Sequence, residues 1–212
     1  MKLLVIGDDK LGRKAFWTLR ESGALTGVDA ALNRSSDPRR VMRLIRRGGI
    51  PFGCAAAMAW AEARRPAQPR PDLPEVRTNP DLQALLQVTT YEAVYLFRAG
   101  VIVNADTLAF GVPFRNLHCA KIPEYAGLCS LWRALRDEAF DQEASLHAIT
   151  TTIDDPSTLF ATEPFRLDPG RSYRENENLA YDVGARLLAR ELSRNLSMTL
   201  RHPSSTVSPL CQ

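Results

Sequence analysis

The chain has 212 residues, of which 45% are hydrophobic and 24% charged, and its net charge at pH 7 is +3. Such a composition is typical of one globular domain with a substantial core. The small net charge argues against a nucleic-acid partner, and the absence of any apolar run near the roughly 20 residues that span a bilayer argues against a membrane partner.

The N-terminal residues and the cysteines indicate the cellular compartment of the protein. The opening residues MKLLVIGDDK lack the basic region, long apolar run and cleavage site of a secretion signal. The four cysteines, Cys54, Cys119, Cys129 and Cys211, match no zinc-ligand spacing and need not pair in a chain without such a signal. A reduced, cytoplasmic setting follows.

The first part of the chain predicts alternating strands and helices. Leu3 to Gly7 is apolar without alternation, which suits a central strand buried on both faces, and residues 11–21 have apolar side chains at helical spacing. A second strand is expected over 28–32 and a helix over 39–47, the latter beginning after Ser36-Asp37-Pro38. This order predicts a parallel α/β sheet.

The turn after the first strand, GDDKLG, does not have the pattern of a phosphate loop. Clustered glycines or a Gly-Lys-Ser/Thr ending would let backbone N–H groups approach a phosphate, whereas the carboxylates of Asp8 and Asp9 would repel it.

Arginines are concentrated between Arg34 and Arg70, where nine stand against two acids. A solvated helix face is the more common explanation of such a run. The alternative is an anchor for an anionic substrate group such as a phosphate, with Arg43 and Arg46 as candidates.

Within the same region, residues 52–63 are apolar nearly all round, which favours a helix buried in the core over a lid. The proline-rich residues 66–74 predict an extended internal connection.

The remaining elements follow in alternation. Short helices are expected over 79–86, 104–110 and 131–137, strands over 93–97, 114–118, 145–153 and 158–165, and a long amphipathic helix over 173–196. We expect a catalytic domain over residues 1–200 and a flexible tail over 201–212.

Asn116 and His118 lie at the end of a predicted strand, where open α/β sheets bind ligands. Residues two apart on a strand share a face, and an amide beside an imidazole can hold a developing oxyanion while the imidazole handles a proton, which suits acyl transfer. Taken alone, a buried histidine with a backbone partner is the more common explanation. Asp154, expected just after another strand, adds a carboxylate that could orient His118 or relay protons. A rival nucleophile, Cys119, should point to the opposite face from His118.

The run NLHCAKIPEYAGLCSLWRAL, starting at Asn116, and the later run SLHAITTTIDD resemble the formyltransferases that use N10-formyltetrahydrofolate. That family includes glycinamide ribonucleotide transformylase, methionyl-tRNA formyltransferase and amino-sugar formyltransferases. The likeness covers about residues 93–165. It implies a single-domain, Rossmann-like α/β fold with a mostly parallel sheet and helices on both faces.

The resemblance also implies roles for individual residues. Asn116 and His118 would be the catalytic pair and Asp154 the catalytic carboxylate, while His147 lies where many members have a histidine. No metal is required. The folate donor would be clasped by two segments, which comprise Val101, Ile102, Val103, Thr151, Thr152, Ile153 and Asp155.

Other positions are less determined. Tyr125 and Trp132 could stack on a substrate or pack internally. The sequence also departs from the family pattern: Asp154-Asp155-Pro156 replaces Asp-x-Gly, Tyr125-Ala126-Gly127 replaces Tyr-Arg-Gly, and Val101 stands where an arginine is common.

The implied activity is formylation of a small amine in a specialised pathway. The first loop differs from that of the purine enzyme, and the additional domains of the tRNA enzyme and the folate hydrolase are not expected. An amino-sugar nucleotide or an amino acid or peptide precursor is therefore the expected acceptor. The alternative is a formyltransferase-like protein that binds a ligand or partner without turnover. No oligomeric interface is indicated, which leaves a homodimer open.

Overall fold

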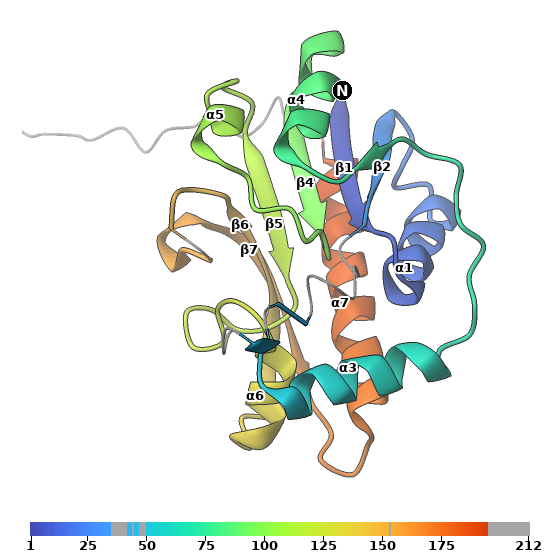
Figure 1. Ribbon diagram of the computed structural model, residues 1–212, viewed down its shortest axis with the longest axis vertical. Helices are drawn as coiled ribbons and strands as arrows, with labels where there is room; N and C mark the ends of the chain where they lie inside the picture. The colour runs from blue at the N-terminus through green and yellow to red at the C-terminus, as the bar shows by residue number, and fades with distance from the viewer. Residues whose placement is uncertain (35–41, 44, 47–49, 153, 195–212) are drawn as a thin grey trace, which may run out of the picture.

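The computed structural model describes residues 1–34, 42–43, 45–46, 50–152 and 154–194. Seven strands form one sheet in the order β3-β2-β1-β4-β5-β6-β7 (Figure 1). The strands are β1 (Lys2–Gly7), β2 (Val28–Asn33), β3 (Glu75–Val76), β4 (Ala93–Phe97), β5 (Phe114–His118), β6 (Asp141–Ala148) and β7 (Leu159–Arg166). The first five are parallel, and β6 and β7 are antiparallel to their neighbours. The expected mostly parallel sheet is confirmed.

Helices cover both faces of this sheet, as expected. They are α1 (Lys10–Glu21), α3 (Phe52–Arg64), α4 (Asn79–Val88), α5 (Ala105–Leu108), α6 (Ser130–Arg136) and α7 (Tyr173–Ser193). Apolar side chains of α1, α6 and α7 join one core cluster with the sheet, and those of α4 join a second cluster on the opposite face. Among the helices described, none has both the length and the low polarity needed to cross a membrane.

β1 is buried along its whole length, because both core clusters draw on its alternating side chains. On the α7 side, Gly184 lets the helix approach the sheet closely. A Cβ atom at this position would lie 2.8 Å from the Cys119 sulfur and 3.1 Å from the Leu117 side chain. The helix therefore rests directly on the end of β5.

Two expectations about element positions are wrong. α3 is a helix, but it is mostly exposed rather than buried: Phe52 is 77% exposed, and Cys54 and Ala61 alone are buried within it. β6 begins at Asp141 and ends at Ala148 instead of extending to residue 153. After it, the Thr150 hydroxyl accepts from the Thr152 N–H at 3.1 Å, a local bond that competes with continuation of the ladder.

Two further predictions fall mainly outside the described residues. Of the helix expected over 39–47, four residues are described and all four are helical. The tail expected over 201–212 is outside the described part of the chain. The last helix ends at Ser193, earlier than the expected residue 196.

Candidate active site

The pairing of β5 with β6 brings the candidate residues together. Asn116 lies opposite His147 in the antiparallel register, and His118 lies on the same face of β5 as Asn116. The turn after β6 returns over this face and supplies Asp154, whose φ of 47° places it in the left-handed region. The sequence motif and the later carboxylate thus meet in one place.

Asp154 is the centre of this cluster. Its Oδ1 atom lies 3.2 Å from His147 Nε2 and 3.5 Å from Asn116 Nδ2, and its Oδ2 atom lies 3.6 Å from His118 Nδ1. The exposed fractions of the side chains are 8% for Asp154, 12% for His118 and 2% for His147. The cluster is therefore largely shielded from water.

The loop between β5 and α6, residues 119–129, contacts the cluster through its backbone. Tyr125 C=O lies 2.9 Å from His118 Nε2, and Gly127 N–H donates to Asp154 Oδ2 at 2.7 Å. Because a carbonyl can only accept, Nε2 of His118 must carry the hydrogen. In the neutral ring, Nδ1 is then a free base that faces Asp154.

The hydrogen bonds of His147 define the orientation of Asn116. His147 Nδ1 donates to the Ala148 carbonyl at 2.9 Å, so the Nε2 atom of the neutral ring is an acceptor. Asn116 Nδ2 donates to it at 3.1 Å. The second amide hydrogen of Asn116 has only the long 3.5 Å contact with Asp154, and a stronger acceptor such as an oxyanion can take it.

The electrostatics keep the carboxylate charged and the imidazole neutral. Burial alone would raise the pKa of Asp154, but the His147 ring at 3.2 Å, the adjacent His118 and the Gly127 N–H outweigh burial and lower the pKa to about 2. Burial lowers the pKa of His118, although the Asp154 carboxylate opposes this shift. At neutral pH the site pairs an anion with an uncharged base.

Of the expected folate-binding residues, those of the first segment lie at an apolar cluster. Val101, Val103 and the nearby Ile149 pack against the cluster on the α4 face, while Ile102 is 71% exposed. Thr151 and Thr152 are exposed in the turn before Asp154.

Two more residues of the expected folate turn have different outcomes. Ile153 lies outside the described residues. The Asp155 carboxylate accepts from the Ser157 N–H at 2.9 Å, at the start of the short 3-10 helix η1 (Pro156–Thr158). Pro156 thus begins a helical turn where a glycine was expected from the resemblance.

The expected substrate residues are not all near the cluster. Tyr125 adjoins it through its carbonyl, and its ring packs beside the Arg133 guanidinium at 5.7 Å. Trp132 packs on the start of α3, where a Cβ at Gly53 would lie 3.3 Å from its ring. Arg43 and Arg46 are exposed on a helical segment.

The cysteines differ from expectation. Cys54 of α3 and Cys129, just before α6, form a disulfide with a Cα–Cα distance of 6.3 Å. The expectation that the cysteines need not pair is wrong for these two, because the chain fold brings α3 beside α6 (Figure 1). Cys119 is free and buried against α7, away from His118, and burial raises the pKa of its thiol well above its ordinary range, so the thiol nucleophile is excluded.

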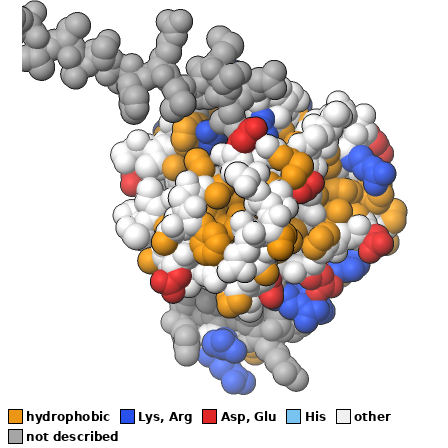
Figure 2. Space-filling model, turned by 90° about the horizontal axis from the view of Figure 1, so that it is seen from above, with side chains coloured by type: hydrophobic (Ala, Val, Ile, Leu, Met, Phe, Trp, Pro, Cys, Tyr) orange, Lys and Arg blue, Asp and Glu red, His pale blue; other side chains and the backbone are white. Residues whose placement is uncertain are grey.

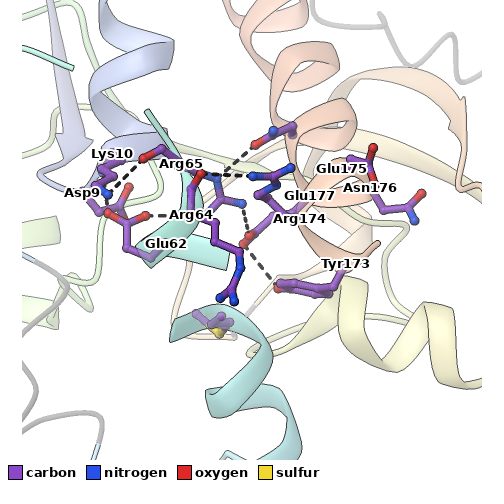
Figure 3. Close-up of polar contacts among 12 residues, drawn as sticks. Asp9, Lys10, Glu62, Arg64, Arg65, Tyr173, Arg174, Glu175, Asn176 and Glu177 are labelled. Carbon is purple, nitrogen blue, oxygen red and sulfur yellow. Dashed lines mark hydrogen bonds and ion pairs between the residues drawn. The ribbon is translucent and has the colours of Figure 1, made fainter. Parts of the chain in front are cut away.

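A second polar region lies at the start of α1 (Figure 3). Asp9 accepts from the Gly12 N–H at 2.8 Å, and Glu62 from α3 accepts from the Lys10 N–H, also at 2.8 Å. Beside them, buried Arg65 pairs with buried Glu177 of α7. Carboxylates of the chain itself thus occupy the helix N-terminus, in agreement with the prediction that this turn is not a phosphate loop.

A cavity of about 640 Å³ lies at the opposite end of the sheet. Its lining includes Leu3, Val28 and Tyr91, at or just before the amino ends of three parallel strands. Hydrophobic and uncharged side chains cover much of that end of the molecule (Figure 2). Ligands of open α/β sheets bind at the carboxyl ends, so we assign the candidate active site to the Asp154 cluster.

No family model and no curated protein matches this sequence. Solved structures do match. A phosphoribosylglycinamide formyltransferase from Bacillus halodurans has a TM-score of 0.61 and 14% identity over 95% of this chain and 100% of its own. A sugar N-formyltransferase from a Shewanella species has a TM-score of 0.60 and 14% identity over 91% and 68%, and a formyltetrahydrofolate deformylase from Pseudomonas syringae has 0.58 and 16% over 90% and 59%.

The chain therefore has the Rossmann-like fold of these formyl-group enzymes, as the resemblance implied. At such identities the likeness establishes the fold, and the activity has to be argued from the site.

Three contributors to the site have weaker signals in the sequence. His147 was noted through the resemblance alone, and its pairing with Asn116 depends on the β5–β6 register. The contacts of Tyr125 C=O and Gly127 N–H are made by backbone groups, which carry no residue-type signal. The alternation of Ser145 and His147 along β6 was the available clue.

Proposed function

We propose that this chain transfers the formyl group of N10-formyltetrahydrofolate to an amine of a small molecule. The observation that carries the proposal is the convergence of Asn116, His118 and Asp154 in a shielded cluster. The fold shared with glycinamide ribonucleotide and sugar formyltransferases supports formyl transfer, and the likeness to a formyltetrahydrofolate deformylase supports the folate donor.

Asn116 would stabilise the oxyanion that forms when the amine attacks the formyl carbon, using its weakly engaged amide hydrogen. His118 Nδ1 would accept the proton lost by the amine, because Nε2–H is held by Tyr125. Asp154 would stabilise the resulting imidazolium and pass the proton toward N10 of the departing folate. His118 thus serves as the base in this proposal rather than as an oxyanion donor.

The test is tetrahydrofolate release from N10-formyltetrahydrofolate with a panel of amino-sugar nucleotides and amino acids. Asp154→Asn should lower kcat by roughly 10²- to 10⁴-fold, as expected for loss of acid–base catalysis. Asp141→Asn is the matched control, since Asp141 pairs with Arg166 at the surface. Equal activity in both variants would remove Asp154 from the mechanism.

The acceptor class is a finer proposal. We propose a specialised-pathway amine, either an amino-sugar nucleotide or an amino acid or peptide precursor. Exposed Arg43 and Arg46 favour an acceptor with a phosphate. Replacing either with alanine should raise the KM of such an acceptor and leave folate binding unchanged, and an unchanged KM would withdraw the argument.

The alternative function is ligand binding without turnover. The altered turn at Pro156 is the feature that favours it. Folate binding with no turnover across the amine panel would support this alternative, whereas absence of folate binding would contradict both functions.

Cytoplasmic location and the absence of nucleic-acid and membrane partners stay predictions. The Cys54–Cys129 disulfide counts against a reducing compartment.

A further inference from the structure

The peptide at Ala126 lies between the two backbone groups that contact the catalytic side chains. Tyr125 C=O on one side meets His118, and Gly127 N–H on the other meets Asp154. A shift or rotation of Ala126 would therefore disturb both contacts together. A contact that holds Ala126 in place therefore also holds the Tyr125 carbonyl on His118 and the Gly127 N–H on Asp154.

The Arg133 side chain of α6 holds Ala126. Its Nη2 donates to the Ala126 carbonyl, and its guanidinium lies 5.7 Å from the centre of the Tyr125 ring. Its Nε atom is buried without a partner, so within the described residues its hydrogen bonding is directed to this loop. Leaving a buried donor unpaired is unfavourable, and stability alone does not account for this placement.

We propose that Arg133 is a positioning residue of the active site, which holds the Ala126 carbonyl and thereby keeps Tyr125 C=O on His118 and Gly127 N–H on Asp154. Its effect on turnover rests on the proposed formyl transfer. Its effect on the geometry of the loop does not depend on that function.

The charge of Arg133 reaches His118 as well. The groups that face the imidazole are the Asp154 carboxylate, the Tyr125 carbonyl, His147 and Arg133. Burial is the main reason why the pKa of His118 is lowered, and the guanidinium adds to the lowering. Loss of the Arg133 charge should move the His118 midpoint upward, whereas loss of the Tyr125 carbonyl contact should move it downward.

The experiment compares Arg133→Met with Arg136→Met. Arg136 lies one turn further along α6, is exposed, pairs with Asp137 and stacks on Trp132, and makes no described contact with the loop. Amide hydrogen exchange at Gly127 and the NMR titration of His118 are measured in both variants and in the intact chain. Arg133→Lys, which keeps a charge and a donor, should give intermediate results.

We expect the Gly127 amide to exchange roughly tenfold faster in Arg133→Met, as for loss of one hydrogen bond. The His118 midpoint should shift as well, and Arg133→Lys, which keeps the charge, isolates the downward part due to the Tyr125 carbonyl contact. We expect kcat to fall roughly 10- to 100-fold with little change in the KM of the folate, since misplaced groups slow the chemical step. Arg136→Met should change none of these values.

Unchanged Gly127 exchange and unchanged His118 titration in Arg133→Met would overturn the proposal. So would a uniform acceleration of exchange that includes β4 amides, because it would indicate general destabilisation. The exchange and titration results need no turnover, so they decide the role of Arg133 even if formyl transfer fails its own test.

Discussion

Two polar regions at the carboxyl end of the sheet use their charged groups in different ways. At the Asp154 cluster, the contacts with Asn116 and His118 are long, at 3.5 and 3.6 Å, and each partner keeps hydrogen-bonding capacity for a ligand. At the start of α1, the carboxylates of Asp9 and Glu62 already accept backbone N–H groups at 2.8 Å.

The Asp154 cluster is therefore open to a ligand, whereas the ion-pair network of Asp9, Glu62, Arg65, Arg98 and Glu177 at the start of α1 is structural. The N-terminus of the first helix is where open α/β sheets commonly receive an anion, yet here the chain supplies its own. Arg98 on Asp9 and Arg65 on Glu177 complete the neutralisation. A phosphate on the acceptor would therefore have to bind elsewhere, and the exposed Arg43 and Arg46 are the candidates.

The largest effect on stability is expected from removal of the buried ion pair between Arg65 and Glu177. Arg65→Met leaves the buried Glu177 carboxylate with only its longer contacts to Arg98 at 3.4 Å and the Tyr173 hydroxyl at 3.3 Å, which should lower the free energy of unfolding by about 3 kcal/mol. Urea denaturation measures this, with Arg64→Met as the control because Arg64 is exposed and stacks on Trp60. The His118 titration should not move; a clear shift would mean that the two regions are coupled.

The disulfide should have the next largest effect. It closes a sequence separation of 75 residues between α3 and the end of the loop between β5 and α6. The double variant Cys54→Ser, Cys129→Ser should lose roughly 2 to 4 kcal/mol of unfolding free energy, and reduction of the intact chain should give the same loss. Peptide mapping tests the bond directly, and the finding of two free thiols in the non-reduced protein would contradict it.

The smallest effect on stability comes from the pH dependence of the Asp154 cluster. The pKa of Asp154 is about 2, below the roughly 3.9 of an unfolded chain, so its stabilisation of about 2 kcal/mol is complete above pH 4 and disappears as the pH falls toward 2. Unfolding free energies of the intact chain and Asp154→Asn should converge over this window. Asp141→Asn should keep the dependence of the intact chain.

The lowered pKa of His118 acts in a different window. Because the folded chain resists protonation of this ring, stability should decline as the pH falls through about 6.5, the value for an unperturbed histidine.

Local sequence patterns predicted the strands and the common face of Asn116 and His118, whereas they could not predict contacts between distant segments. The unbroken apolar run at Leu3 to Gly7 correctly predicted a central strand, and alternation correctly placed Asn116 and His118 on one face. The pairing of Asn116 with His147 depends on strand register between distant segments, which composition does not encode. The prediction that α3 is buried is wrong because its alanines tolerate exposure as readily as burial.

The close packing at Gly184 should limit which substitutions the chain tolerates on the α7 side of the sheet. A methyl group there would meet the sulfur of Cys119, the neighbour of His118, at 2.8 Å. Substitution on the far side of the sheet would thus press on side chains of the segment that carries His118, the proposed base. Among variants selected for the proposed activity, we expect this position to vary as little as Asn116, His118 and Asp154.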